Sequence, residues 1–347
     1  MLLTTIVAAV VVFGVLVTVH ELGHFATAKL TGMRVDEFAI GFGPKVISHK
    51  FGETVYSIRA IPLGGFNDIA GMDPENNDAG ERGYCEKSIP RRMLVIVAGS
   101  AMNLILPIFI FFGVAYFAGV SQPVNEPVFG TVIPGKAAAQ AGLQEGDRVL
   151  SIDGRPIATW TEFVNDIKDT PANESIQLTM QRGADTFTTE VHPAYDSQTK
   201  RAMIGVTSSV KTTYPGLLES AGLAVQRTGY IIYMMCDALY RIVLELSGAD
   251  LAGPVGVAQM AGEVAQMGIV PLLNFAAFLS LNLGIVNMFP IPALDGGHFF
   301  MLCLEALRGK PLKPETMEYL AKGGIALLVL LTLFATKNDI VRIFMGG

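Results

Sequence analysis

The sequence predicts a polytopic α-helical membrane protein with four transmembrane helices and an inserted extracytoplasmic α+β domain. Three observations predict this class. Of the 347 residues, 51% are hydrophobic and only 16% are charged, against about 25% charged residues in an ordinary soluble domain. Mean hydropathy is +0.45, and four segments approach the roughly 20 apolar residues of a membrane span. The net charge of −6 comes without any basic stripe, which argues against a nucleic-acid partner.

The four predicted spans lie in two pairs along the chain. They cover about Leu3 to Leu30, Met93 to Val120, Ile269 to Leu294 and Gly323 to Thr336. The first lacks the basic start and small-residue cleavage site of a signal peptide, so we expect a retained helix. A further segment, Leu217 to Leu246, is interrupted by charged residues, and it fits an amphipathic helix at the membrane surface better than a span.

The placement of lysine and arginine predicts the orientation. Basic residues follow the first span, precede the second, and separate the third from the fourth: Lys29, Arg34, Arg91, Arg92, Arg308, Lys310 and Lys313. Basic loops tend to stay in the cytoplasm. Both ends of the chain and the long middle section are therefore predicted to be extracytoplasmic.

These features divide the chain into four regions. Residues 1–120 hold two spans and a cytoplasmic loop, 121–200 a compact domain, 201–268 an amphipathic helical region, and 269–347 the last two spans. In the compact domain, short β-type runs alternate with two helical patterns, and Arg182-Gly183-Ala184-Asp185 is typical of a hairpin turn. Its stretch GTVIPGKAAAQAGLQEGDRVLSIDG resembles a PDZ domain. Such a module can bind a peptide terminus in its groove, and a purely structural cap is the alternative.

The first cytoplasmic loop, Thr31 to Arg92, is richer in glycine than a plain connector needs. The sequences IGFGP and PLGGF flank a strand pattern at Thr54 to Ile61. Its apolar residues favour a hairpin or loop that dips back toward the bilayer, which is tolerated where protein or water covers the backbone. An ordinary cytoplasmic loop is the alternative.

The sequence HELGH places three ionisable groups near the end of an otherwise apolar first span. His20 and His24 are four residues apart and project from one face of a helix, with Glu21 beside them. This H-E-x-x-H pattern is the zinc-protease signature, in which the glutamate acts as the general base. Because ionisable groups at membrane depth are costly, they are functional or mutually satisfied. Two histidines hydrogen-bonded within a helical core are the alternative.

A catalytic zinc site needs a third protein ligand. Asp295 is the best candidate, because it is the first charge after the longest apolar run and follows two prolines that break the helix. His298 is the rival ligand, or else a partner of a ligand. Asp295 reaches the depth of His20 only if the chain has four spans. The three cysteines are scattered without a CxxC pair, so no disulfide framework is expected: Cys85, Cys236 and Cys303.

Three asparagines also lie within the apolar spans: Asn103, Asn282 and Asn287. Hydrogen bonds between helices are the common use of such residues. Asn282 and Asn287 precede Asp295 and could instead hold the backbone of an unwound substrate. The residues themselves leave both interpretations open.

Together, HELGH, the PDZ-like stretch, GPVG at 253–256 and NLGIVNMFPIPALDGG at 282–297 resemble the site-2 protease family. Within it, the chain is similar to bacterial intramembrane zinc metalloproteases of the RseP and RasP type. The resemblance covers nearly the whole chain. It departs from the family in having a single PDZ-like unit, and in having Asn67-Asp68 where relatives often have Val-Lys.

The resemblance implies His20, His24 and Asp295 as ligands of Zn²⁺ and Glu21 as the catalytic base. It implies a membrane-reentrant β element from GFGP and TVYSIRAIPLGGF, with substrate contacts at Gly64, Gly65, Phe66, Asn282 and Asn287. The site would face the cytoplasmic side of the bacterial cytoplasmic (inner) membrane.

The implied function is intramembrane cleavage of the transmembrane segments of single-span proteins, such as anti-sigma factors or signal-peptide remnants, after a prior extracytoplasmic cut. A membrane scaffold or metal-binding receptor that recruits peptides is the alternative from another class, and it gives Glu21 no role. A metal transporter is less consistent with a single cluster of ligands.

Overall fold

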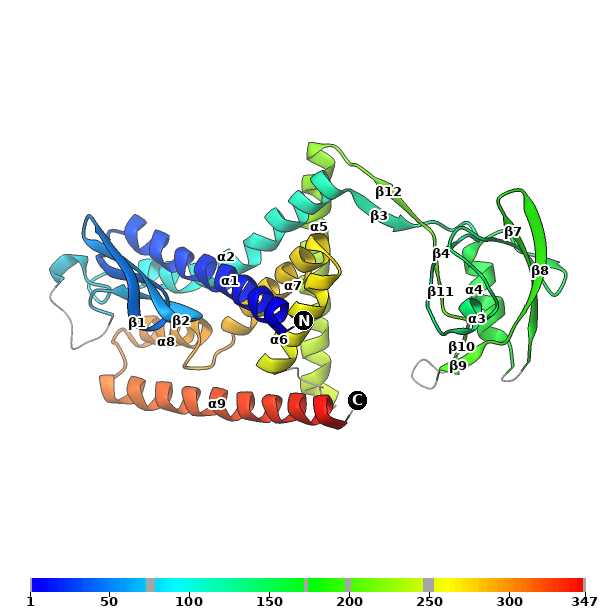
Figure 1. Ribbon diagram of the computed structural model, residues 1–347. Helices are drawn as coiled ribbons and strands as arrows, with labels where there is room; N and C mark the ends of the chain where they lie inside the picture. Colours follow the sequence, from blue (N-terminus) through cyan, green and yellow to red (C-terminus); the bar gives the residue numbers. More distant parts are fainter. Residues whose placement is uncertain (1, 73–78, 172–173, 197–200, 246–252, 346–347) are drawn as a thin grey trace. The chain divides into compact units, whose positions relative to one another are not determined.

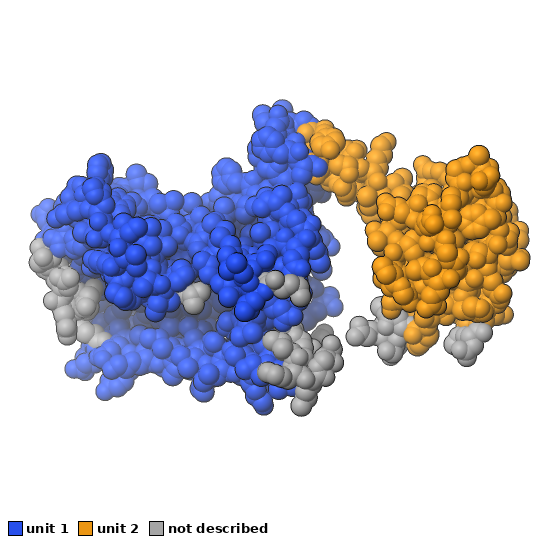
Figure 2. Space-filling view, viewed as in Figure 1, with its two compact units in different colours: residues 1–118, 216–347 blue, residues 119–215 orange. Residues whose placement is uncertain are grey.

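A computed structural model describes residues 2–72, 79–171, 174–196, 201–245 and 253–345. Its helices and strands are drawn in Figure 1. The chain forms two compact units, coloured separately in Figure 2. The helical unit comprises Met1–Ala118 and Gly216–Gly347, and the inserted unit comprises Gly119–Pro215.

Four helices of the helical unit are long and apolar enough to cross a membrane. They are α1 (Leu2–Leu30), α2 (Ile89–Gly113) continued by the π-helical turn η2 (Val114–Ala118), α7 (Ile269–Asn287) and α9 (Pro314–Met345). The helix α5 (Leu217–Glu245), which runs crosswise to α9 in Figure 1, does not meet the same criteria. The expectation of four candidate spans in a multi-pass protein is confirmed.

Small residues bring α1 and α2 close together. A Cβ at Gly23 would lie 2.4 Å from the carbonyl oxygen of Ala98, so only glycine permits this approach of the two backbones. On another side of α1, Val12 and Leu16 pack with Leu279 of α7. These contacts hold the HELGH turn of α1 against α2.

The third span is shorter than the sequence predicts. We expected it to continue to Leu294, but α7 ends at Asn287 and a turn leads to a separate helix, α8 (Asp295–Arg308). Pro290 and Pro292 lack a backbone N–H and restrict the residue before them, so the helix cannot continue through them. Asp295 therefore begins a new helix.

The N-terminal end of the short helix α6 (Pro254–Gln266) is hydrogen-bonded to the last span, α9. The carboxylate of Asp339 in α9 accepts hydrogen bonds from the backbone N–H groups of Gly253 and Gly256, at 3.0 and 2.8 Å. A Cβ at Gly262 would lie 2.1 Å from Thr5 Oγ1, so α6 also packs closely on α1. This arrangement ties α9 to the N-terminal helix.

The first loop folds into an antiparallel hairpin of β1 (Val35–Phe51) and β2 (Thr54–Ile69), followed by the 3₁₀ turn η1 (Gly80–Arg82). Near its turn, residues 47–51 lie opposite 54–58. Residues 37–40 lie opposite 65–68, and they also lie opposite 55–58. The stretch 65–68 is therefore paired on one side by residues 37–40, beside α1.

The inserted unit is a small α+β module. Its strands are β3 (Val120–Pro123), β4 (Phe129–Val132), β5 (Arg148–Ile152), β6 (Arg155–Pro156), β7 (Ile176–Arg182), β8 (Asp185–Val191), β9 (Ala194–Asp196), β10 (Arg201–Met203), β11 (Val206–Ser208) and β12 (Val210–Thr213). Its helices are α3 (Ala137–Gln140) and α4 (Trp160–Asp169). The central sheet has the order β6-β5-β7-β8, and the expected hairpin turn at 182–185 joins β7 to β8.

Short antiparallel pairs extend this module beyond residue 200. β9 pairs with β10, β4 with β11, and β3 with β12. Residues 201–213, which the sequence assigned to the helical region, thus carry strands. Each of these strands has three or four residues, too few to show the alternation that marks a strand in a sequence. Phe129, Phe163, Leu178 and Met180 lie in the core of the module.

Candidate metal centre

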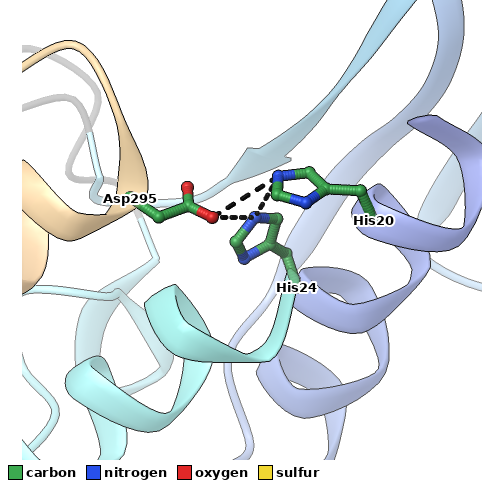
Figure 3. Close-up of side chains that lie close together, drawn as sticks. All are labelled: His20, His24 and Asp295. Atoms are coloured by element: carbon green, nitrogen blue, oxygen red, sulfur yellow. Dashed lines mark hydrogen bonds and ion pairs between the residues drawn. The ribbon is translucent and has the colours of Figure 1, made fainter. Parts of the chain in front are cut away.

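Three potential metal ligands from two helices converge at one point. Figure 3 shows His20 and His24 on one helix facing the carboxylate of Asp295. His20 Nε2 lies 3.2 Å from His24 Nε2, and Asp295 Oδ2 lies 3.4 and 3.6 Å from the two nitrogens. The side chains are only 11, 12 and 17% exposed. Among the described residues, these three form a group that could hold a metal ion.

The spacing of these atoms fits zinc. Ligand atoms about 2.0–2.1 Å from a tetrahedral zinc ion lie roughly 3.3–3.4 Å from one another. The three measured separations of 3.2, 3.4 and 3.6 Å bracket that value. The group thus matches one face of a tetrahedron and leaves a fourth position for water or substrate, as catalytic zinc sites require.

The outer nitrogen of His24 is fixed by the backbone of α2. His24 Nδ1 lies 2.8 Å from the carbonyl oxygen of Val95, which can only accept a hydrogen bond, so Nδ1 carries the proton. The lone pair of Nε2 then points at His20 and Asp295. Such an outer contact is the usual way in which proteins orient a metal-binding histidine.

The outer nitrogen of His20 lies against the amide of Asn103. Asn103 Nδ2 is 3.2 Å from His20 Nδ1, while Asn103 Oδ1 is buried without a hydrogen-bond partner among the described residues. The two ends of an amide have nearly the same shape, so the group fits in either orientation. If the Asn103 amide is turned by half a rotation, its oxygen accepts a hydrogen bond from a protonated His20 Nδ1. His20 Nε2 then carries a lone pair, as His24 Nε2 does. Three lone pairs that converge within 4 Å suit a bound cation.

Asp295 is oriented by a serine of α2. The hydroxyl of Ser100 donates a hydrogen bond of 2.9 Å to Asp295 Oδ2, the oxygen that faces both histidines. Ser100 is fully buried. The neighbouring Gly99 leaves room for the His24 ring, because a Cβ at position 99 would lie 2.2 Å from His24 Nε2.

The position of α8 is set by tight packing and a buried ion pair. Cβ atoms at Gly296 and Gly297 would lie 2.2 Å from the carbonyl oxygens of Met288 and Ile291. Further along α8, Glu305 forms two hydrogen bonds with the guanidinium of Arg92 in α2, at 2.6 and 3.1 Å. Asp295 thus sits at the start of a helix held at both ends.

Glu21 lies between the metal ligands and the hairpin. The side-chain amide of Asn67 in β2 donates to Glu21 Oε2 at 2.7 Å and to the Glu21 carbonyl oxygen at 2.8 Å. A Cβ at Gly65 would lie 3.0 Å from Glu21 Cγ. The hairpin edge therefore passes directly beside the glutamate of the HELGH motif.

The other residues predicted to contact substrate lie on β2 and α7. Phe66 stacks on Phe42 with ring centres 6.4 Å apart, and Gly64 has a φ of +99°, where L side chains are rarely found. Asn282 is exposed on α7, and Asn287 is half-buried at its last turn.

The remaining candidates stay outside the metal group. His298, the rival ligand, lies in α8 but is not a member of the group of three. The three cysteines are free, as expected: Cys85, Cys236 and Cys303.

Two contacts were missed by sequence reasoning. Ser100 was not considered, and Asn67 was noted only as a departure from the family pattern. The signal for Ser100 was the run of small residues Ala98-Gly99-Ser100 inside an apolar helix, which permits another helix to come close. For Asn67, the signal was a polar residue directly after the apolar run IPLGGF at 61–66.

The chain is similar to known metalloproteases over almost its whole length. The model of Peptidase family M50 matches residues 8–331. The zinc metalloprotease RasP of Bacillus licheniformis is 35% identical, with 99% of this chain and 100% of that protein covered. The regulator of sigma-W protease RasP of Bacillus subtilis is 34% identical over the same shares.

Solved structures of PDZ domains match part of the chain. One of them is the PDZ domain of the SdrC-like protein Lmo2051 from Listeria monocytogenes, at 22% identity and a TM-score of 0.21, covering 25% of this chain and 86% of that one. The family match spans both the HELGH helix and the helix that carries Asp295. As the sequence resemblance to site-2 proteases predicted, the chain belongs to peptidase family M50.

Proposed function

We propose that the protein is an intramembrane zinc endopeptidase that cleaves the transmembrane segments of single-span membrane proteins. The observation that carries the proposal is the convergence of His20, His24 and Asp295 at zinc-like spacing, beside a glutamate and within helices suited to a bilayer. Relatives bear the names zinc metalloprotease and regulator of sigma-W protease. Anti-sigma factors and signal-peptide remnants, already shortened by an extracytoplasmic cut, are therefore the substrates we expect.

In the proposed mechanism, His20, His24 and Asp295 bind the metal, and Glu21 accepts and transfers the proton. Bound zinc would supply Lewis-acid polarisation of the scissile carbonyl and acidify a water molecule. Glu21 takes the proton from that water as it attacks, and then returns it to the leaving amine. Ser100 and Asn103 keep Asp295 and His20 in the orientation that the ligands need.

The hairpin edge would present the substrate to this site. A substrate helix must unwind, because its carbonyl groups are otherwise hydrogen-bonded within the helix. Residues 65–68 offer backbone groups to an extended chain, in the manner of strand addition to a sheet edge. Gly64, Gly65 and Phe66 would contact that chain, and Asn282 and Asn287 would hold its backbone from the side of α7.

The inserted unit would act as a PDZ-like module that selects shortened substrates. A cavity of about 600 Å³ lies between α4 and β10, with Phe163, Val164 and Ile167 among its apolar lining. Lys136, Lys168 and Arg201 also line it, so its charge suits a peptide terminus that ends in a carboxylate.

The orientation proposed for the protein follows from the basic loops. We place the inserted unit outside the bacterial cytoplasmic membrane, the metal group toward the cytoplasmic side, and the β1–β2 hairpin as a reentrant element. The salt bridges of Glu53 with Lys29 and Arg82 tie the hairpin turn to the loop side of α1.

The test compares the wild-type protein with Glu21→Gln in proteoliposomes that contain a single-span model substrate. We expect both proteins to retain about one zinc per chain by elemental analysis. Cleavage by Glu21→Gln should fall by at least about 10²-fold, the lower range for loss of a general base. Normal turnover by this variant would refute the proposal.

A matched pair of variants separates the two candidates for the third ligand. Asp295→Ala should lose its zinc, whereas His298→Ala should retain it, because only Asp295 belongs to the group of three. The opposite pattern would exchange their roles. A protein that binds peptides but no zinc would instead favour the scaffold function.

A further inference from the structure

One side chain connects the proposed base with the proposed substrate edge. Asn67 lies on β2, directly after Phe66, and its amide group donates to two oxygens of the same residue, Glu21. One of these oxygens belongs to the carboxylate and the other to the helix backbone. The amide thus fixes the carboxylate relative to the turn of α1 that carries both histidines.

The orientation of this amide is determined by its surroundings. Both atoms of Glu21 that it meets are acceptors, so only the NH₂ end can face them. The opposite end, Asn67 Oδ1, is buried without a hydrogen-bond partner among the described residues. The hydrogen bonds to Glu21, and not those of Oδ1, therefore hold this side chain in place.

The position of Asn67 also sets the register of the strand. Phe38 lies opposite Asn67, and Ala39 lies opposite Phe66. A Cβ at Gly65 would already lie 2.8 Å from the Ala39 carbonyl oxygen and 3.0 Å from Glu21 Cγ. The strand is therefore confined between β1 and α1, and Asn67 joins it to the latter by hydrogen bonds.

We propose that Asn67 is a positioning residue that holds the Glu21 carboxylate in register with the substrate edge of β2. This inference rests on the proposed function. Its two hydrogen bonds join the carboxylate and the backbone of Glu21 to one residue of β2. Asn67 thus aims the base at a peptide bond that lies along the hairpin.

The experiment measures kcat and KM of the zinc-loaded, full-length protein in proteoliposomes with the same single-span substrate. Asn67→Val should lower kcat by about 10- to 100-fold, the effect of a slightly misplaced catalytic group, and leave KM within about twofold. Zinc content should stay at the wild-type value. Lys50→Ala, at an exposed position of β1, is the control and should leave both constants unchanged.

A double-mutant cycle distinguishes positioning from a general structural effect. Glu21→Asp retracts the carboxylate by one methylene group and removes its hydrogen bond with Asn67, while the bond from Asn67 to the backbone carbonyl oxygen remains. In that background, Asn67→Val should change kcat by less than about threefold, because no contact with the carboxylate is left to lose. Should Asn67→Val fail to load zinc, the same cycle is measured with Asn67→Ala.

Three outcomes would overturn the inference: an equal loss of kcat in both backgrounds, a rise in KM alone, or no change. If the zinc-loaded wild type cleaves no single-span substrate, the proposed function fails instead. Thermal unfolding of the four proteins then decides the question about Asn67 without turnover. Shifts in Tm that are non-additive by about 2 °C or more support the contact, and additive shifts refute it.

Discussion

Substitution of Ser100 by alanine should weaken zinc binding without disturbing the fold. The change removes one hydrogen bond, of 2.9 Å, to Asp295 Oδ2, the oxygen that faces both histidines. A hydrogen bond to a charged group contributes about 1.5–3 kcal/mol, and each 1.4 kcal/mol is a factor of ten in affinity. We therefore expect zinc affinity to fall by about 10- to 100-fold, which agrees with the usual effect of losing a partner of a metal ligand.

The assay is competition for zinc between the purified protein and a chelator of known affinity. Thr54→Ala is the control, because Thr54 is also buried and donates to a carbonyl oxygen, that of Val35, rather than to a metal ligand or a residue that orients one. Its zinc affinity should stay within about twofold of wild type. Equal affinities of Ser100→Ala and wild type would refute the claim that Ser100 orients Asp295.

Three more predictions follow from contacts around the site. Gly99→Ala should abolish zinc binding in elemental analysis, because the new Cβ would lie 2.2 Å from His24 Nε2. Arg92→Met should lower the free energy of unfolding, measured by thermal or chemical denaturation, by about 3–5 kcal/mol, since it leaves Glu305 buried without its partner. Burial would raise the pKa of Glu37, but three hydrogen bonds outweigh it and hold the pKa at about 2. Because the folded-state pKa lies below the ordinary glutamate value of 4.5, that stabilisation should be lost as pH falls from about 4.5 to 2. Glu37→Gln should show no such loss when hairpin proteolysis is followed against pH.

The sequence predicted those parts of the site that depend on local spacing or on composition. His20 and His24 are four residues apart in one helix, so their shared face follows from helix geometry alone. Asp295 was found because it ends a long apolar run behind two prolines. The four candidate spans followed from hydropathy, and the charged residues within α5 separated that helix from them.

The contacts that orient the ligands could not be read from the sequence. Ser100 is 195 residues from Asp295, and Asn67 is 46 residues from Glu21. Whether such side chains meet depends on how α2 is rotated about its own axis and on the register of β2 against α1. Neither quantity has a periodic signature in one sequence. The end of α7 at Asn287 was missed for a related reason, because apolar residues continue past the point where proline ends the helix.

X-ray absorption at the zinc edge of the purified protein tests the central claim most directly. The account predicts one zinc per chain with two imidazole nitrogens and light oxygen ligands at about 2.0–2.2 Å, and loss of the bound zinc in Asp295→Ala. A sulfur shell near 2.3 Å, or an unchanged spectrum in Asp295→Ala, would contradict a metal centre shared by α1 and α8.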